Sequence, residues 1–216
     1  MKNYEIIIFD LDGTLSNSKE GITKSVQYAL SKLGIIEENL DSLEHFIGPP
    51  LKDEMIRTYK VSEEEAEKAV AYYRERYVPK GIYETEIYPG TEEMLSNLKS
   101  SGKRIALATS KPQQMAEEVL QYLKIERYFD SVMGAELTGP RQSKRAVLEA
   151  LLEESKIKDK EKCIMIGDTC YDIDGAKAVG LDSAGVAYGF GNTIEMLEHG
   201  ALTVFKKTED IIRFLK

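Results

Sequence analysis

The sequence predicts an α/β protein with a doubly wound, mostly parallel sheet and a small all-helical insert after the first strand. Two observations support this fold class. Strand-like apolar runs alternate with helical patterns over residues 89–216, which is typical of parallel α/β sheets. Residues 16–88 break that alternation and show helical periodicity, with no convincing strand.

The first strand is expected at residues 6–9, because the run IIIF is apolar throughout, as in strands buried on both faces. The other elements of the sheet follow after Pro89. Pro112 is expected in the first turn of a helix, where its missing N–H does no harm, and Gly180 is expected to close another. The predicted strands are 104–110, 129–135, 162–168, 182–189 and 202–205, and the predicted helices are 91–100, 112–123, 143–155, 171–180, 193–200 and 208–216.

The helical insert divides the chain into two predicted domains, an α/β core of residues 1–15 and 89–216 and a helical domain of residues 16–88. Ser62 and Glu65 have the spacing of a capping box at the start of one insert helix. Two helical faces are marked by apolar residues at helical spacing: Ile22, Val26, Leu30 and Leu33, then Ala66, Ala69, Val70, Tyr73 and Tyr77.

Composition excludes several classes of partner. The net charge is −8 and no block of Lys and Arg is present, so neither nucleic acid nor an anionic membrane is an expected partner. No apolar run approaches the roughly 18 residues of a spanning helix, and the N-terminus lacks signal-peptide features. Cys163 and Cys170 form no CxxC pair, which speaks against a disulfide framework or zinc site. We expect a cytoplasmic protein; the oligomeric state stays open.

Three predicted strands end in polar residues. Asp10 and Asp12 follow the first strand, Thr109 and Ser110 end the second, and Asp168 ends the strand at 162–168. Because ligands bind beyond the carboxyl ends of strands in open α/β sheets, we expect these groups to form one site.

The two aspartates of the first strand end need a compensating positive charge. Residues two apart in a strand point to the same side, so Asp10 and Asp12 are expected to converge, and Asp168 to meet them from another strand. Burying carboxylates without compensation is costly. Hard oxygen ligands with room for water and phosphate oxygens suit Mg²⁺, and Lys144 is the expected second cation.

Four motifs of this sequence resemble those of the haloacid dehalogenase (HAD) superfamily of phosphohydrolases. They are DLDGT at residues 10–14, ATS at 108–110, SK ending at Lys144, and GDTCYD at 167–172. The resemblance spans the whole chain, since the helical insert resembles the small cap domain of that family. GPPL and PGT make the phosphoglycolate phosphatase-like branch the most similar one.

The resemblance implies a role for each matching residue. Asp10 is the expected nucleophile that forms an aspartyl phosphate, and Asp12 the expected acid and base at the leaving oxygen. Thr109 and the N–H of Ser110 are expected to hold phosphoryl oxygens. Lys144 is expected to screen charge between Asp10 and phosphate.

The same resemblance implies the metal ligands. Mg²⁺ is expected on Asp10, the main-chain carbonyl of Asp12, and Asp168, with Asp172 in support. Gly13 is expected to let the backbone turn beneath the phosphate. Many relatives carry lysine followed by proline at the third motif, and this chain has RQSKRAV. Arg141 is therefore an alternative to Lys144, which we prefer because it begins a helix.

The predicted function is Mg²⁺-dependent hydrolysis of a small phosphorylated metabolite. Phosphoglycolate, a nucleoside monophosphate (5′-nucleotidase activity) and pyrophosphate all stay open as substrates, with specificity expected from the insert, near residues 48–52. A phosphomutase and a phospho-aspartate signalling switch are alternatives on the same scaffold. An acid at Asp12 argues against the switch, because it helps to hydrolyse the phosphoaspartate. GFG at residues 189–191 is too short for a dinucleotide fingerprint and indicates a loop.

Overall fold

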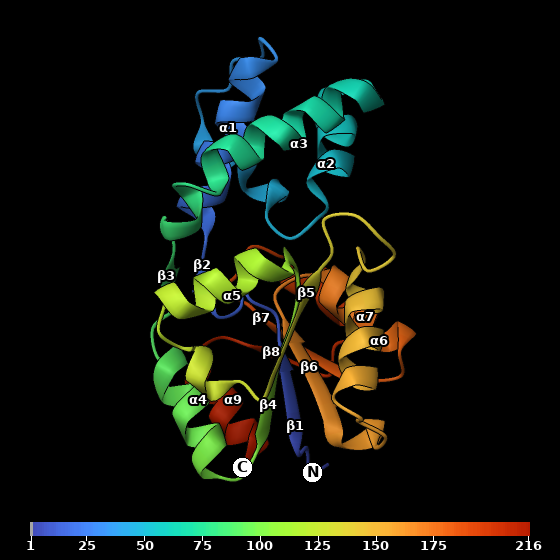
Figure 1. Cartoon of the computed structure of the whole chain (residues 1–216). Coiled ribbons are helices and arrows are strands. Elements are labelled where there is room, and N and C mark those ends of the chain that lie inside the picture. The colour runs from blue at the N-terminus through green and yellow to red at the C-terminus, as the bar shows by residue number, and fades with distance from the viewer. Residues whose placement is uncertain (1) are drawn as a thin grey trace. The chain divides into compact units, whose positions relative to one another are not determined.

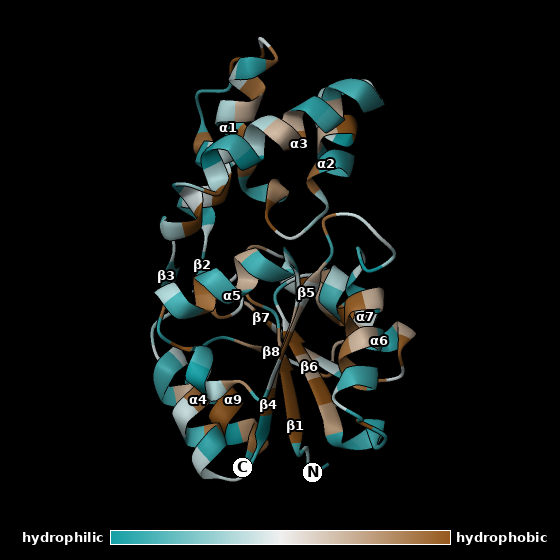
Figure 2. Ribbon diagram, in the orientation of Figure 1, coloured by the Kyte–Doolittle hydropathy of each residue, from teal (hydrophilic) through white to brown (hydrophobic). Residues whose placement is uncertain are grey.

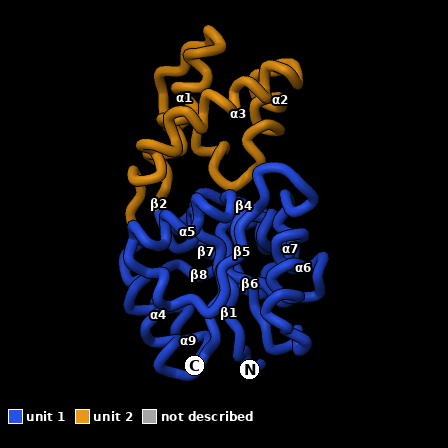
Figure 3. Tube along the Cα trace, in the orientation of Figure 1, with its two compact units in different colours: residues 1–16, 87–216 blue, residues 17–86 orange. Residues whose placement is uncertain are grey.

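The computed structural model describes residues 2–216. The chain divides into two compact units, one of residues 1–16 and 87–216 and one of residues 17–86, coloured separately in Figure 3. The chain crosses between them at the short strands β2 (Ser16–Asn17) and β3 (Glu86–Ile87), which pair with each other. The predicted boundaries at 15–16 and 88–89 lie within two residues of these crossings, and the division into domains stays a prediction.

The larger unit is built on a parallel sheet with β1 near its centre (Figure 1). The strand order is β5-β4-β1-β6-β7-β8, and every pairing within this sheet is parallel. The predicted doubly wound α/β class is confirmed. The strands are β1 (Ile6–Phe9), β4 (Arg104–Pro112), β5 (Ser131–Ala135), β6 (Cys163–Gly167), β7 (Asp182–Val186) and β8 (Val204–Phe205).

Helices cover both faces of this sheet. Ile6 and Ile8 of β1 pack in one apolar cluster with Val147, Leu148 and other residues of the helices α6 (Lys144–Glu154) and α7 (Cys170–Ala178). The opposite side is lined by α4 (Thr91–Ser100), α5 (Gln113–Tyr122) and α9 (Thr208–Leu215), as Figure 1 shows. Burial on two sides explains why β1 is apolar at every position, and the central strands are brown in Figure 2.

The predicted helices of this unit are found with small shifts at their ends, α8 (Thr193–His199) among them. Pro112 differs from the prediction: it ends β4 and is the N-cap of α5 instead of lying in the first turn. Its φ of −54° and ψ of 139° are extended, so the strand continues up to the residue from which the helix starts. Gly180 follows α7 with a φ of +77°, as expected of a residue that closes a helix.

The register of the sheet places the end of β1 beside β4 and β6. Phe9, the last residue of β1, lies beside Leu107 of β4 and Ile166 of β6. The residues that follow these positions therefore start side by side, although β4 itself runs on to Pro112. Segments far apart in the sequence thus come to one edge of the sheet.

The smaller unit, residues 17–86, consists of helices apart from the ends of β2 and β3. Its capping box at Ser62 and Glu65 is confirmed, with the Glu65 N–H donating to Ser62 Oγ at 3.3 Å. Helix α2 and the segment before it were not expected, because short helices leave weak periodicity. The elements are α1 (Lys19–Lys32), the 3₁₀ helix η1 (Leu40–Phe46), α2 (Leu51–Tyr59), α3 (Glu63–Tyr77) and the 3₁₀ helix η2 (Gly81–Tyr83).

Among the described residues, none of the helices combines the length and apolar character that crossing a bilayer requires.

Candidate active site

Asp10 lies directly beyond β1 and is almost fully buried. It continues the side of the strand formed by Ile6 and Ile8, which α6 and α7 cover. Burial raises the pKa of its carboxyl group to about 6, and the neighbouring Asp172 and Asp12 add to this, although Lys144 opposes the shift. The negative charge of a carboxylate at this position is therefore only partly compensated by the surrounding positive charge.

Lys144 is the first residue of α6 and reaches into this cluster. Its Nζ lies 2.8 Å from Asp10 Oδ1 and 2.8 Å from Asp172 Oδ1, and it donates a hydrogen bond to the Ala108 carbonyl at 3.0 Å. Burial alone lowers the pKa of a lysine, but the two carboxylates outweigh burial and raise it. Lys144 is therefore charged, as the sequence predicts for the second cation.

A glycine of the neighbouring helix makes room for this lysine. A Cβ atom on Gly175 of α7 would lie 2.6 Å from Lys144 Cγ, so a larger residue at that position would displace the lysine stem. Ser143, the N-cap of α6, accepts a hydrogen bond from the Ala146 N–H at 3.2 Å and fixes the start of the helix.

Arg141, the alternative cation, lies elsewhere. Its guanidinium pairs with Glu136 at 3.8 Å and with Glu154 at 3.8 Å. The structure thus pairs Lys144, and not Arg141, with Asp10.

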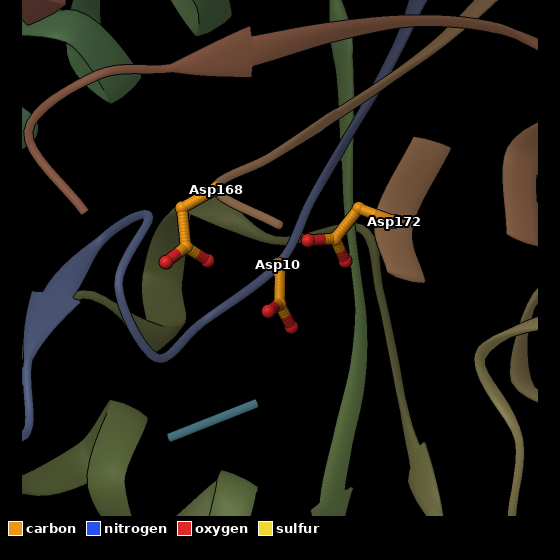
Figure 4. A group of neighbouring side chains, drawn as sticks. All are labelled: Asp10, Asp168 and Asp172. Carbon is orange, nitrogen blue, oxygen red and sulfur yellow. The ribbon is translucent and has the colours of Figure 1, made fainter. Parts of the chain in front are cut away.

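Asp10, Asp168 and Asp172 form the acidic cluster of the site, shown in Figure 4. One carboxylate oxygen of each lies within 4.8 Å of the others, and all three residues are buried. Burial raises the pKa of Asp168 well above its usual range, and the charges of Asp172 and Asp10 raise it further. Like charges held this close in a buried site need a cation among them.

The donor set fits a divalent metal ion. It offers hard carboxylate oxygens, which suit Mg²⁺. The ammonium group of Lys144 contacts Asp10 and Asp172, and a single positive charge compensates only one of three negative charges. The side chain of Asp12 is not part of this cluster, and a role of its main-chain carbonyl as a ligand stays a prediction.

Asp168 is held in place by two loops. It follows β6, and its Oδ2 accepts a hydrogen bond from the Phe190 N–H at 2.8 Å. Thr14 Oγ1 lies 3.4 Å from Asp168 Oδ1. Gly13 has a φ of +81°, and a Cβ atom there would lie 2.1 Å from Asp168 Oδ2. Only glycine allows both this backbone conformation and this close approach.

The GFG sequence forms a loop, as predicted, but the loop belongs to the site. A Cβ atom on Gly189 would lie 2.3 Å from Asp168 Cβ, and one on Gly191 would lie 1.9 Å from the Asp168 carbonyl oxygen. Tyr188, just before the loop, donates a hydrogen bond from Oη to the Thr14 carbonyl at 3.1 Å. Two glycines beyond the carboxyl end of a strand were the signal that could have placed this loop beside the site.

Asp172 combines a capping role with a place in the cluster. Its Oδ2 accepts hydrogen bonds from the Thr169 N–H at 3.1 Å and Thr169 Oγ1 at 3.0 Å, while Oδ1 faces Lys144. A Cβ atom on Gly167 would lie 2.1 Å from the Asp172 carboxyl carbon. The bonds to Thr169 therefore fix Asp172 in a tight space from which it contacts Lys144.

Asp12 has a partner of its own that the sequence analysis missed. Its Oδ2 lies 2.9 Å from Nζ of Lys111, and both side chains are largely buried. Lys111 directly follows the ATS segment at the end of β4. A lysine at a strand end that carries other site residues was the available signal.

Thr109 is buried near the carboxyl end of β4, and Ser110 beside it is partly buried. Thr109 Oγ1 accepts a hydrogen bond from the Lys111 N–H at 3.2 Å. The two residues thus lie in the strand next to Asp10, where the sequence places them, and their contacts to phosphoryl oxygens stay a prediction.

A family model described as "Haloacid dehalogenase-like hydrolase" matches residues 7–186, which is most of the chain and includes all the residues of the site except Tyr188 and the GFG loop. The chain belongs to this haloacid dehalogenase-like hydrolase family. Phosphoglycolate phosphatases of several bacteria match with 26 to 30% identity.

Three proteins similar to this chain show which names occur within the family. A 5′-nucleotidase of Pseudomonas aeruginosa is 43% identical over 91% of this chain and 88% of its own length. The tyrosine-protein kinase PtkA of Mycobacterium tuberculosis is 36% identical over 87% of this chain and 63% of its own. The crystal structure of a predicted phosphatase from Clostridium acetobutylicum superimposes with a TM-score of 0.95 at 41% identity, covering 99% of this chain and 98% of the other.

These findings confirm the predicted HAD superfamily and its phosphoglycolate phosphatase-like branch. They also confirm the enzyme class, a phosphoric monoester hydrolase of the HAD type. The roles of the individual residues stay predictions.

Proposed function

We propose that this HAD phosphatase hydrolyses a small phosphate monoester with Mg²⁺, through an aspartyl phosphate on Asp10. The observation that supports this best is the position of Asp10, which touches Lys144 and shares a cluster with Asp168 and Asp172. A carboxylate surrounded by other carboxylates and one lysine has the surroundings of a nucleophile that works on an anionic substrate beside a metal ion.

Asp10 attacks the phosphorus atom, and the bond from phosphorus to the leaving oxygen breaks. Lys144, 2.8 Å from Asp10 Oδ1, offsets the repulsion between this carboxylate and the phosphate dianion, which is an electrostatic contribution to catalysis. Its contact with Asp172 holds the ammonium group in place during this step.

Asp10, Asp168 and Asp172 would hold the metal, with the main-chain carbonyl of Asp12. When bound, Mg²⁺ would supply positive charge next to the phosphoryl oxygens. The Phe190 N–H and the Thr169 N–H keep Asp168 and Asp172 oriented for this role.

Asp12 protonates the leaving oxygen in the first half-reaction and takes a proton from water in the second. The water oxygen then bonds to phosphorus, the bond from phosphorus to Asp10 breaks, and inorganic phosphate is released. Thr109 and the N–H of Ser110 hold the transferring phosphoryl group, and Gly13 turns the backbone beneath it with its positive φ.

The helical unit is the proposed cap that selects the substrate. Within it, Lys52 is already engaged, because its Nζ lies 3.3 Å from Glu63 and 2.9 Å from Glu67. Gly48, Pro49 and Pro50 precede α2 and stay as candidates for substrate contact.

A nucleoside 5′-monophosphate is the first substrate to test, since the 43% identical relative is named a 5′-nucleotidase. Phosphoglycolate is the second substrate to test, because several other relatives are named phosphoglycolate phosphatases. Pyrophosphate is the third. We expect the enzyme to act on such metabolites in the cytoplasm.

The test is phosphate release from p-nitrophenyl phosphate and from this panel, measured with Mg²⁺ and again with excess EDTA. We expect release only with Mg²⁺. Absence of release with every substrate would contradict the proposal and favour a signalling switch. Isomerisation of a sugar phosphate would favour a phosphomutase, and transfer of phosphate to a tyrosine peptide would favour the activity named in PtkA.

A further inference from the structure

We propose that Lys111 is a positioning residue for Asp12: it anchors one carboxylate oxygen so that the other transfers the proton to and from the leaving group. This inference rests on the proposed function, in which Asp12 is the acid and base. It adds a residue that acts on the reaction through its ion pair with Asp12.

The first observation is the burial of the pair. Among the described residues, Lys111 and Lys144 are the two buried lysines. The Lys111 side chain is 5% exposed and that of Asp12 is 12% exposed, with 2.9 Å between Nζ and Oδ2. Exposed ion pairs contribute little and rearrange easily, whereas removing one partner of a buried pair leaves an uncompensated charge. This pair is therefore a fixed part of the site.

The two buried lysines have separate carboxylates. Lys144 contacts Asp10 and Asp172, and Lys111 contacts Asp12. One lysine thus serves the nucleophile, and the other serves the acid and base.

The second observation is that the backbone holds both partners. The Lys111 N–H donates to Thr109 Oγ1 at 3.2 Å, at a position where the pairing of β4 with β5 shifts register. On the other side, the Gly13 N–H donates to the Ser16 carbonyl at 2.8 Å and closes the turn that carries Asp12. Because both main chains are fixed, the ion pair sets the rotation of the Asp12 carboxylate.

The third observation concerns the other carboxylate oxygen. Asp12 Oδ1 is buried and accepts no hydrogen bond from any residue between 2 and 216. Buried polar atoms normally have a partner. The pair with Lys111 thus leaves one oxygen of Asp12 anchored and the other unpartnered, and the unpartnered one is available to a leaving-group oxygen or to water.

The chemistry gives this arrangement a specific consequence. When the bond from Asp10 to phosphorus forms and the bond to the leaving oxygen breaks, an alkoxide must receive a proton from Asp12. The nitrophenolate released from p-nitrophenyl phosphate leaves without a proton. Loss of Lys111 should therefore lower kcat/KM for alkyl phosphates much more than kcat/KM for p-nitrophenyl phosphate. If Lys111 instead bound the phosphate group directly, its loss would lower both values equally.

The experiment compares Lys111→Met, Lys111→Arg and the wild-type enzyme on two substrates. The first is p-nitrophenyl phosphate, and the second is phosphoglycolate or a nucleoside 5′-monophosphate, whichever the wild type hydrolyses. General acid catalysis contributes about 10²–10⁴-fold, so we expect Lys111→Met to lower kcat/KM at least about 10²-fold for the alkyl phosphate and less than about 10-fold for p-nitrophenyl phosphate. Lys111→Arg should restore part of the alkyl activity, because it keeps the charge.

Two further variants separate positioning from stability. Lys160→Met removes a lysine whose Nζ bonds the Val179 carbonyl at 2.9 Å, and it should leave both activities unchanged. In an Asp12→Asn background, Lys111→Met leaves no unpaired buried charge, and we expect it to cost less than about 3-fold in further activity, because residues that act through one group are not additive.

The inference would be overturned if Lys111→Met lowered kcat/KM equally for both substrates. It would also be overturned if Lys111→Met cost more than about 10-fold in further activity in the Asp12→Asn background. Either result would leave the proposed function standing. Failure of the wild-type enzyme to hydrolyse any substrate with Mg²⁺ would overturn the proposed function itself.

Discussion

Lys144 Nζ lies at the same distance, 2.8 Å, from Asp10 Oδ1 and from Asp172 Oδ1. One ammonium group thus joins the residue after the first strand to the first turn of α7. The contact explains why a residue 134 positions after Asp10, at the start of a helix, belongs to the same site.

Asp10→Asn should abolish turnover and leave the fold intact. The amide keeps the shape of the side chain but cannot act as the nucleophile, and loss of a nucleophile costs about 10⁴-fold or more. Steady-state phosphate release measures the first point, and thermal unfolding the second. Asp174→Asn, at a residue that pairs with His199 at 2.9 Å, is the control and should retain activity. Near-normal activity of Asp10→Asn would show that another group attacks phosphorus.

Lys144→Met should both destabilise the protein and inactivate it. Breaking a buried ion pair costs about 3–5 kcal/mol, here because Asp10 and Asp172 lose their shared cation. Urea unfolding without Mg²⁺ measures the free energy of unfolding, and phosphate release measures activity. Arg141→Met is the matched control: Arg141 pairs with Glu136 and Glu154, so activity should change less than about 3-fold. If Arg141→Met alone inactivated the enzyme, Arg141 would have to be a residue of the active site.

Mg²⁺ should stabilise the protein more at about pH 8 than at about pH 5. Folding raises the pKa of Asp10 from its ordinary 3.8 to about 6, and that of Asp168 also rises. The stability from this tighter proton binding is fully present below pH 3.8 and is lost as the pH rises through 6. Mg²⁺ replaces those protons, so it competes with them at about pH 5 and binds freely at about pH 8.

Thermal unfolding with saturating MgCl₂ and with EDTA measures this effect. A metal at about 100 times its Kd adds roughly 2.7 kcal/mol, so we expect a rise in Tm of about 5–10 °C at the higher pH. Asp168→Asn should remove most of that rise. Equal shifts at both pH values would contradict the competition between protons and metal.

Gly189→Ala should weaken metal binding without unfolding the protein. The added Cβ would meet Asp168 Cβ at 2.3 Å and the Gly13 carbonyl oxygen at 2.4 Å, so the loop must shift and its N–H bond to Asp168 weakens. A loss of roughly 10-fold in metal affinity fits the loss of an outer contact to a ligand. Isothermal titration with MgCl₂ measures it.

Gly34→Ala is the control for backbone strain, because Gly34 has a φ of +77° and no neighbour within 4 Å of an added Cβ. It should lower stability by about 1 kcal/mol and leave metal affinity unchanged. Equal metal affinity of Gly189→Ala and wild type would mean that the GFG loop does not hold Asp168.

Periodicity predicted the architecture of the larger unit well, and for a physical reason. Strands buried on both faces must be apolar at each position, as β1 is, and helices that cover a sheet must repeat with a period near 3.6. Pro112 was misplaced because its fixed φ suits both a strand end and a helix start.

The candidate site could be predicted where side chains carry the chemistry. Polar residues at strand ends and helix starts could be recognised in the sequence, and the structure brings four of them together: Asp10, Lys144, Asp168 and Asp172. The contact of the Phe190 N–H with Asp168 could not be predicted, because every residue except proline carries that donor.

Lys111 was missed for a different reason. A lysine in a sequence is most often a surface residue. The place of Lys111 at the end of β4 was a signal that it lies near the site, but that place alone does not show that it is buried against Asp12. That pairing depends on the strand order, which places β4 beside β1, and strand order is a property of the whole chain.

The same strand order affects how the protein is made. β1 hydrogen-bonds to β4 on one side and to β6 on the other, so its partners follow it by about 100 and about 160 residues. On the ribosome, the four apolar residues of the first strand have no strand neighbour until about half of the polypeptide has been synthesised, and they lack the second neighbour until β6 follows. Nascent chains that stop before residue 163 therefore expose an open sheet edge, a surface that chaperones bind and that aggregates readily.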